Sequence, residues 1–177
     1  MAGRRRGRES VADMVRSLGL VLAVVVVVFL IARPSASNSQ RVRTVDYGPD
    51  VARARAVAPY QVLAPVGLGA GWRSTSSRVD APAPGTPGPV ALHIGFVTPR
   101  DAYAALEESN AETDAFVADR TNGAAPRSSV VVGGRPWEQR QAIDATRALV
   151  QRGGGTTLVV TGTASVVELT ELAAALR

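Results

Sequence analysis

The sequence lacks cysteine and lysine, and among its 177 residues it has a single histidine, His93. Without cysteine the chain has no disulfide, no thiol nucleophile and no side chain for lipid attachment through sulfur. A zinc site would need three carboxylates beside the one histidine. A Ser-His-Asp arrangement would likewise have to be built on His93. These absences leave little room for the common catalytic and metal-binding constellations.

All 20 basic residues are arginine, and the formal net charge is +5. From Arg33 onward, however, 15 arginines face 13 acidic residues, so this part carries a net charge of only +2. Aromatic residues make up 5% of the chain, and no basic stripe interleaved with aromatics is present. The sequence therefore argues against a nucleic-acid partner.

An uninterrupted apolar run of 15 residues extends from Leu18 to Ala32. As a helix it would be about 22 Å long, which is short of the ~30 Å bilayer core unless Met14 and Val15 join it. Arg16 would then extend its guanidinium back to the headgroups. Because lipid offers no partner to backbone amides, a single pass has to be helical. We therefore expect a transmembrane helix over residues 16–33, in contact with the lipid bilayer.

Arginine placement predicts the orientation of this helix. Five arginines lie in or next to the tail 1–15, whereas Arg33 alone follows the run directly. The N-terminus is therefore expected in the cytoplasm and the rest of the chain outside the cell membrane. A cleaved signal peptide over 16–37 is the alternative, because its apolar core has 7–15 residues. Both interpretations export residues 38–177.

After the run, residues 34–47 are predicted as a stalk that leads into a short edge strand, and residues 48–177 have the size of one domain. A short helix is expected over 51–58, behind a proline in its first turn. Strands are expected over 72–79 and 90–97, paired as an antiparallel hairpin through a proline-rich loop.

Two helical segments are predicted next. Thr98 followed by proline is typical of a helix start, which favours a helix over 102–109. On that helix Glu107 and Glu108 would point in different directions. A second helical segment is expected over 112–119.

The C-terminal part predicts four strands in a meander and a terminal helix. The strands are expected over 128–132, 137–143, 147–152 and 156–161, with turns at Gly133-Gly134, Asp144-Ala145 and Gly153–Gly155. Ser165 and Glu168 form a capping box for a helix that carries Leu169, Leu172, Ala173 and Leu176 on one face. The predicted fold class is α+β, an antiparallel sheet of about five to six strands with helices packed on it.

A series of short motifs occurs in an order that is more specific than any one of them. These are Asp13-Met14 with Arg16-Ser17, PVGLGAGWR (65–73), LHIGFVTP (92–99) with residues 103–107, the lone Trp137, TLVVTGTA (157–164) and LTELAAAL (169–176). In this order they resemble the actinobacterial single-pass membrane proteins of domain-of-unknown-function family 4245. The resemblance covers roughly residues 13–177 and implies an anchored envelope protein. It supplies no catalytic residue.

No residue of the exported part stands out as catalytic, cofactor-binding or metal-binding, and no cofactor is expected. Alternation places His93 on the strand face opposite Leu92 and Ile94, where a packed, hydrogen-bonded histidine is the simpler interpretation. Paired carboxylates are not selected by any pattern. The glycine clusters at 133–134 and 153–155 fit hairpin turns and lack the lysine of a phosphate loop.

The remaining candidates are large or cationic side chains on predicted strands. Trp72 and Trp137 are expected mainly in the core. A weak candidate interaction surface comprises Trp72, Arg73, Arg78, Arg140 and Arg147, whose arginines could line a groove for an acidic envelope polymer.

The sequence thus predicts a non-catalytic, membrane-anchored binding domain whose partner is an unknown envelope protein or polymer. The alternative is a small envelope hydrolase or sensor with a cryptic site. That alternative requires a pocket that brings His93 within hydrogen-bond reach of an acid and a hydroxyl.

Overall fold

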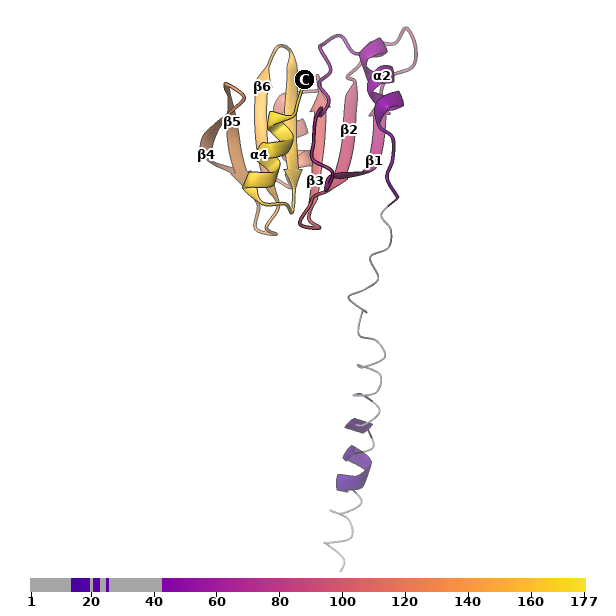
Figure 1. Ribbon diagram of the computed structural model, residues 1–177, viewed down its shortest axis with the longest axis vertical. Coiled ribbons are helices and arrows are strands. Elements are labelled where there is room, and N and C mark those ends of the chain that lie inside the picture. Colours follow the sequence, from indigo (N-terminus) through magenta and orange to yellow (C-terminus); the bar gives the residue numbers. More distant parts are fainter. Residues whose placement is uncertain (1–13, 20, 23–24, 26–42) are drawn as a thin grey trace, which may run out of the picture. The chain divides into compact units, whose positions relative to one another are not determined.

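The computed structural model describes residues 14–19, 21–22, 25 and 43–177. Residues 14–19, 21–22 and 25 are helical, and the residues from 43 onward belong to a separate compact unit (Figure 1). In the described part of the chain, no helix has both the length and the apolar character needed to cross a membrane. The greater part of the predicted membrane run, and the stalk up to residue 42, lie outside the described residues.

The folded unit is built on one antiparallel sheet of seven strands in the order β1-β2-β3-β7-β6-β5-β4. The strands are β1 (Arg73–Asp80), β2 (Ala91–Val97), β3 (Tyr103–Ser109), β4 (Ala125–Val132), β5 (Arg135–Gln141), β6 (Arg147–Gly153) and β7 (Thr156–Gly162). The α+β class, the long-looped β1–β2 hairpin and the four-strand meander β4–β7 are confirmed. The expected number of five to six strands was too low.

The additional strand is β3, which replaces the helix predicted over 102–109. Alanine, leucine and glutamate favour helices, but propensity is a weak preference that tertiary context overrides. β3 pairs with β2 on one side and β7 on the other, and Ala104 and Leu106 are fully buried in it. The hydroxyl oxygen of Thr98 accepts hydrogen bonds from the backbone amides of Arg100 and Ala102, at 3.3 and 3.2 Å. The expected helix start is therefore a tight turn between two strands.

Three helices complete the unit: α2 (Gly48–Val57), α3 (Thr113–Arg120) and α4 (Val166–Ala174). All three were expected from the sequence, and the Ser165–Glu168 capping box of α4 is present. The predicted edge strand before α2 is absent from residues 43–47. Instead, Val45 forms two isolated hydrogen bonds with Ser74 at the start of β1.

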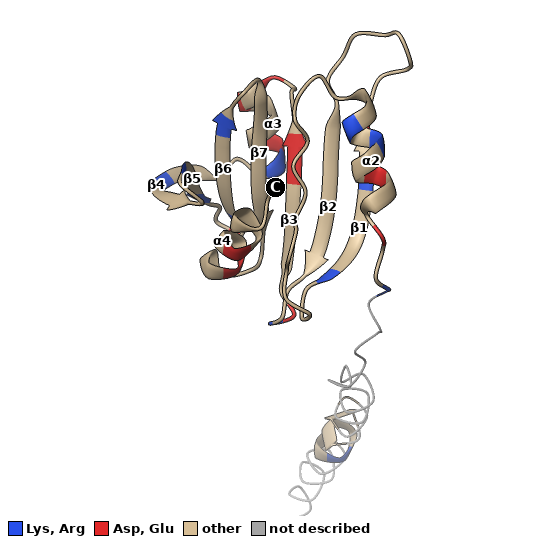
Figure 2. Cartoon of the chain, turned by 45° about the horizontal axis from the view of Figure 1, so that its top comes forward, with Lys and Arg blue, Asp and Glu red and all other residues tan. Residues whose placement is uncertain are grey.

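The helices cover both faces of the sheet. We call the face that packs against α2 and α4 the α4 face; its core includes Leu92, Leu106 and Leu149 together with Leu169 and Leu172 of α4. We call the opposite face the α3 face, where a smaller cluster joins α3 to β6 and β7. Figure 2 shows α2 and α4 on one side of the sheet and α3 behind β7.

Candidate functional site

Two neighbouring glutamates in the central strand β3 lie on opposite faces of the sheet. Strand alternation directs Glu107 to the α3 face and Glu108 to the α4 face. Both are buried, with 6% and 0% of their surface exposed. Figure 2 shows acidic side-chain positions on β3, which lies between β2 and β7 in the sheet. A buried carboxylate is costly unless it is paired or hydrogen-bonded, so the partners of each glutamate identify two candidate sites.

On the α3 face, Glu107 ends a chain of hydrogen bonds that runs across three strands. The hydroxyl Oγ of Ser76 in β1 lies 2.9 Å from Nε2 of His93 in β2. Nδ1 of His93 lies 2.6 Å from Oε1 of Glu107. Oε2 of Glu107 lies 3.6 Å from Nε of Arg120 in α3. The order of hydroxyl, imidazole and carboxylate is the connectivity of a serine hydrolase triad.

Local backbone features place the three side chains in this line. A register shift between Ser74 and Ser76 brings Ser76 opposite Gly95, beside His93. Such bulges redirect side chains on an edge strand. A Cβ atom at Gly95 would collide with Oγ of Ser76 and lie 3.1 Å from the hydroxyl of Tyr103. Glycine is therefore required for the serine and the tyrosine to share this space.

The same packing limits what the chain of hydrogen bonds can do. The side chains of His93 and Glu107 are 11% and 8% exposed, and Ser76 and Tyr103 occupy the space above Gly95. Acyl transfer needs room for a substrate carbonyl and donors for its oxyanion. Two cavities on the α4 face, and a third at the turns beside Asn122 and Asp144, are lined by other residues. The geometry thus provides the hydrogen bonds of a hydrolase triad, while Tyr103 and the burial of His93 and Glu107 leave little space for a substrate beside them.

On the α4 face, Glu108 has a different environment. Its Oε2 accepts the backbone amide of Leu63 at 3.0 Å. Burial raises the pKa of Glu108 to about 7, against the lowering effects of the Leu63 hydrogen bond and of the nearby Arg55 charge. Its second oxygen, Oε1, is buried and has no hydrogen-bond partner within the described chain. Such an atom is unusual in a native interior and marks a position to explain.

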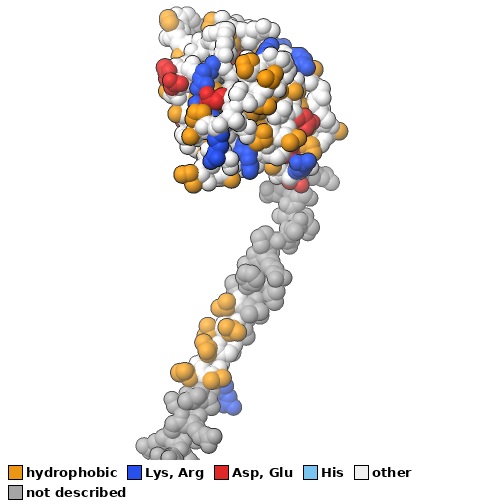
Figure 3. Space-filling model, turned by 90° about the vertical axis from the view of Figure 1, so that its left-hand side faces the viewer, with side chains coloured by type: hydrophobic (Ala, Val, Ile, Leu, Met, Phe, Trp, Pro, Cys, Tyr) orange, Lys and Arg blue, Asp and Glu red, His pale blue; other side chains and the backbone are white. Residues whose placement is uncertain are grey.

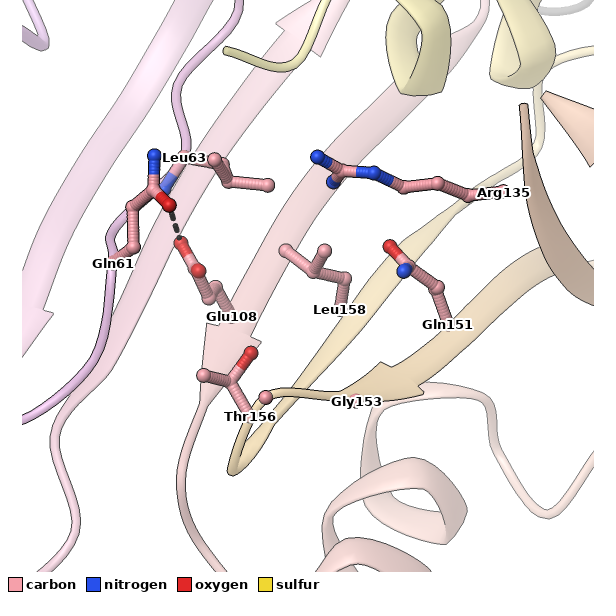
Figure 4. Close-up of a pocket in the computed structure, with 9 residues that line it drawn as sticks. Gln61, Leu63, Glu108, Arg135, Gln151, Gly153, Thr156 and Leu158 are labelled. Atoms are coloured by element: carbon pink, nitrogen blue, oxygen red, sulfur yellow. Dashed lines mark hydrogen bonds between the residues drawn. The ribbon is translucent and has the colours of Figure 1, made fainter. Parts of the chain in front are cut away.

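Glu108 lines a cleft on the α4 face. Two adjoining cavities of about 270 and 320 Å³ share the lining residues Gln61, Leu63 and Arg135, and we call them together the Arg135 cleft. Glu108 and Gln151 line the first cavity, and Trp137 lines the second. In Figure 4, Glu108 and Gln151 rise from the sheet, Gln61 and Leu63 form one wall, and Arg135 reaches over the cavity.

Glu108 is not the only unpartnered group beside the cleft. Nε1 of Trp137 and Oε1 of Gln151 are also buried without a hydrogen-bond partner among the described residues. Trp137 is 2% exposed. Three residues that line the cleft thus have a buried polar atom without a hydrogen-bond partner in residues 43–177.

The five residues of the predicted interaction surface are not brought together. Trp72 is 9% exposed, and its Nε1 donates to Glu171 at 3.1 Å, so it lies in the core of the α4 face. Arg73 and Arg78 are on the edge strand β1 and pair with Asp101 and Asp80.

The other two predicted arginines lie far across the sheet from that edge. Arg140 is on β5, where its side chain pairs with Glu138 and donates to the carbonyl oxygen of Ala124. Arg147, on β6, lies 3.5 Å from the carbonyl oxygens of Thr163 and Ala164. Alternation along the strands directs Arg140 and Arg147 to opposite faces. Figure 3, viewed from the side of β4 and β5, shows several basic side chains beside acidic ones on one part of the surface and other basic side chains apart from them.

His93 and the Glu107-Glu108 pair stand out in the sequence, but the sequence does not show which residues they meet. The pairing of Ser76 with His93 depends on the β1 register shift, and Glu108 was assigned to a helix. Strand alternation in 103–109 could have separated the two glutamates. Gln151 and Arg135 carry no sequence signal of their own. No group of three or more His, Asp or Glu side chains in the described residues is arranged to hold a metal ion.

Comparison with known proteins agrees with the order of the sequence motifs. Residues 6–176 match the family described as Protein of unknown function (DUF4245). No curated protein and no solved structure shows significant similarity to the chain. The match extends over almost the whole sequence, from the arginine-rich tail to the end of the sheet unit, and on this ground the chain belongs to the DUF4245 family.

Proposed function

We propose that this protein is a non-catalytic binding domain of the cell envelope, held at the cell membrane by a single helix over residues 16–33. The observation that carries the binding role is the Arg135 cleft. Glu108, Gln151 and Trp137 line its cavities, and each has a buried polar atom without a hydrogen-bond partner among the described residues. Preformed concave sites with a few convergent polar groups are typical of small-molecule binding.

The anchor gives such a site a physical advantage. The apolar run from Leu18 to Ala32 and the arginines before it support a membrane helix with a cytoplasmic N-terminus. Tethering confines the domain near the membrane and raises the effective concentration of a neighbouring envelope component. Even a weak site would then be occupied.

Complementation of a deletion strain tests this proposal, with the envelope defect of that strain as the readout. Ser76→Ala and His93→Gln should restore the wild-type envelope, because neither residue lines the cleft. A variant that carries both Arg135→Gln and Gln151→Leu should fail, while the matched control Arg127→Gln with Gln141→Leu should succeed. Circular dichroism of each purified variant establishes that it is folded. Loss of function in folded Ser76→Ala, with the cleft variant active, would overturn the proposal.

A serine hydrolase is the second candidate, and the Ser76–His93–Glu107 chain of hydrogen bonds favours it. Oγ of Ser76 would attack an ester carbonyl while His93 takes its proton and Glu107 orients the imidazole. A fluorophosphonate probe, which reacts with activated serines, separates the two candidates. Labelling of the full-length chain that disappears in Ser76→Ala and persists in the exposed control Ser128→Ala would establish the hydrolase. We expect no labelling.

A further inference from the structure

The size of the Arg135 cleft limits which ligands it can bind. Its two cavities of about 270 and 320 Å³ meet at Gln61, Leu63 and Arg135. Sites for drug-sized ligands usually measure ~300–1,000 Å³. Each cavity is therefore suited to a molecule or polymer unit of about one small ring, and the pair could hold a short extended ligand.

The charges around the cleft favour an anion. Arg135 forms no ion pair with any residue in the described ranges. Arg177, which lines the second cavity, already donates to the carbonyl oxygens of Ala174 and Leu176. Glu108 is the one acidic residue in the lining of the two cavities. A guanidinium without a partner is suited to bidentate recognition of a carboxylate.

The unpartnered atoms indicate hydroxyl groups elsewhere on the ligand. Oε1 of Gln151 is an acceptor and Nε1 of Trp137 is a donor, whereas Oε1 of Glu108 accepts when the carboxylate is ionised and donates when it is protonated. Hydroxyl groups can both donate and accept, so a ligand rich in hydroxyls could satisfy all three atoms. Leu63 and Leu158 provide apolar surface between them, against which the carbon skeleton of such a ligand could lie.

We propose that the Arg135 cleft binds a small hydroxylated carboxylate of the sugar-acid class, either free or as a unit of an acidic envelope polymer. The carboxylate pairs with the guanidinium of Arg135. The ligand hydroxyls form hydrogen bonds with Glu108 Oε1 and donate to Gln151 Oε1, and one of them accepts from Trp137 Nε1. This assignment rests on the binding function proposed above and specifies its ligand.

Calorimetric titration of the full-length chain in detergent micelles tests the assignment, with glucuronate as the probe and methyl glucoside as a neutral sugar of similar size. We expect saturable binding of glucuronate and weaker binding of methyl glucoside. Arg135→Gln should weaken glucuronate binding by about tenfold or more, as expected for the loss of a charge-assisted pair. The same variant should leave methyl glucoside binding unchanged. Gln151→Leu should weaken both, and the controls Arg127→Gln and Gln141→Leu should weaken neither.

Two outcomes would overturn the ligand assignment. Equal binding of glucuronate and methyl glucoside would show that the cleft does not recognise the carboxylate. Absence of glucuronate binding would exclude sugar acids as the ligands of the cleft. In either case the complementation experiment tests the binding function separately. The variant with Arg135→Gln and Gln151→Leu should fail to complement whatever the natural ligand is. If the cleft variant also restores the envelope fully, the binding function itself is wrong.

Discussion

At the scale of single residues, the two glutamates of β3 illustrate how one strand supplies two environments. Glu107 has charged or polar partners at both of its oxygens, His93 at 2.6 Å and Arg120 at 3.6 Å. Oε2 of Glu108 accepts a hydrogen bond from one backbone amide, and its Oε1 has no partner in the part of the chain that the structure describes. Because burial disfavours its charged form and raises its pKa to about 7, Glu108 makes the stability of the folded domain depend on pH below neutrality.

We predict that the stability of the domain falls as pH rises from about 4.5 to 7. Burial raises the pKa of Glu108 from its ordinary 4.5 to about 7. In this window the folded state holds a proton that the unfolded state has lost, so the free energy of unfolding decreases with pH. The decrease attributable to Glu108 is at most about 3 kcal/mol and levels off above pH 7. Urea unfolding at a series of pH values measures it.

Glu108→Gln should remove most of this pH dependence, because glutamine does not titrate. The control is Glu112→Gln at the N-terminal cap of α3, where hydrogen bonds from Ala115 and Asp114 lower the pKa of Glu112. That control should retain the fall in stability between pH 4.5 and 7. A Glu108→Gln variant with an unchanged pH profile would show that Glu108 titrates normally.

At the scale of elements, the sequence was most informative where local signals and the tertiary fold agree. Helix α4 has a capping box, a continuous apolar stripe and a sheet to cover, so its start and its buried face were predicted correctly. The β4–β7 meander was equally legible, because glycine and Asp144-Ala145 turns separate its strands.

β3 shows where local signals fail. Its alanines and glutamates favour a helix, but its position between β2 and β7 provides backbone partners on both sides. That position depends on the long return of the chain through β4–β7, which no local pattern reports. The candidate sites were missed for the same reason. Ser76 meets His93 only in the shifted register of β1, and Glu108 faces the cleft only because β3 is a strand.

For α4 we predict that Leu172→Ala lowers the free energy of unfolding by about 2–5 kcal/mol, the usual cost of emptying a packed core position. Leu172 is fully buried against the sheet. Val167 of the same helix is 69% exposed, so Val167→Ala serves as the control and should cost less than about 0.5 kcal/mol. Equal stability of the two variants in chemical denaturation would mean that α4 is not packed as described.

At the scale of the whole molecule, the chain consists of two parts with different composition. The N-terminal part combines arginines with the apolar run, whereas the sheet unit from residue 43 has a mixed charge and its own core. A ligand site in the sheet unit has a raised effective concentration near the membrane only if that unit stays covalently linked to the apolar run in the cell. Whether residues 16–37 are retained therefore determines how the Arg135 cleft would work.

We predict that the N-terminus lies in the cytoplasm and that residues 38–177 lie outside the cell membrane. Protease added to intact cells from which the wall has been removed should digest the sheet unit and spare a tag placed before Arg4. Lysed cells provide the control, since there the tag should be digested as well. A full-length chain found in the membrane fraction fits the anchor, because a retained apolar helix resists extraction by salt and alkali. If the domain is instead recovered from the culture medium with its first residue near Asn38, the segment 16–37 is a cleaved signal. Binding would then depend on the free concentration of the domain rather than on tethering.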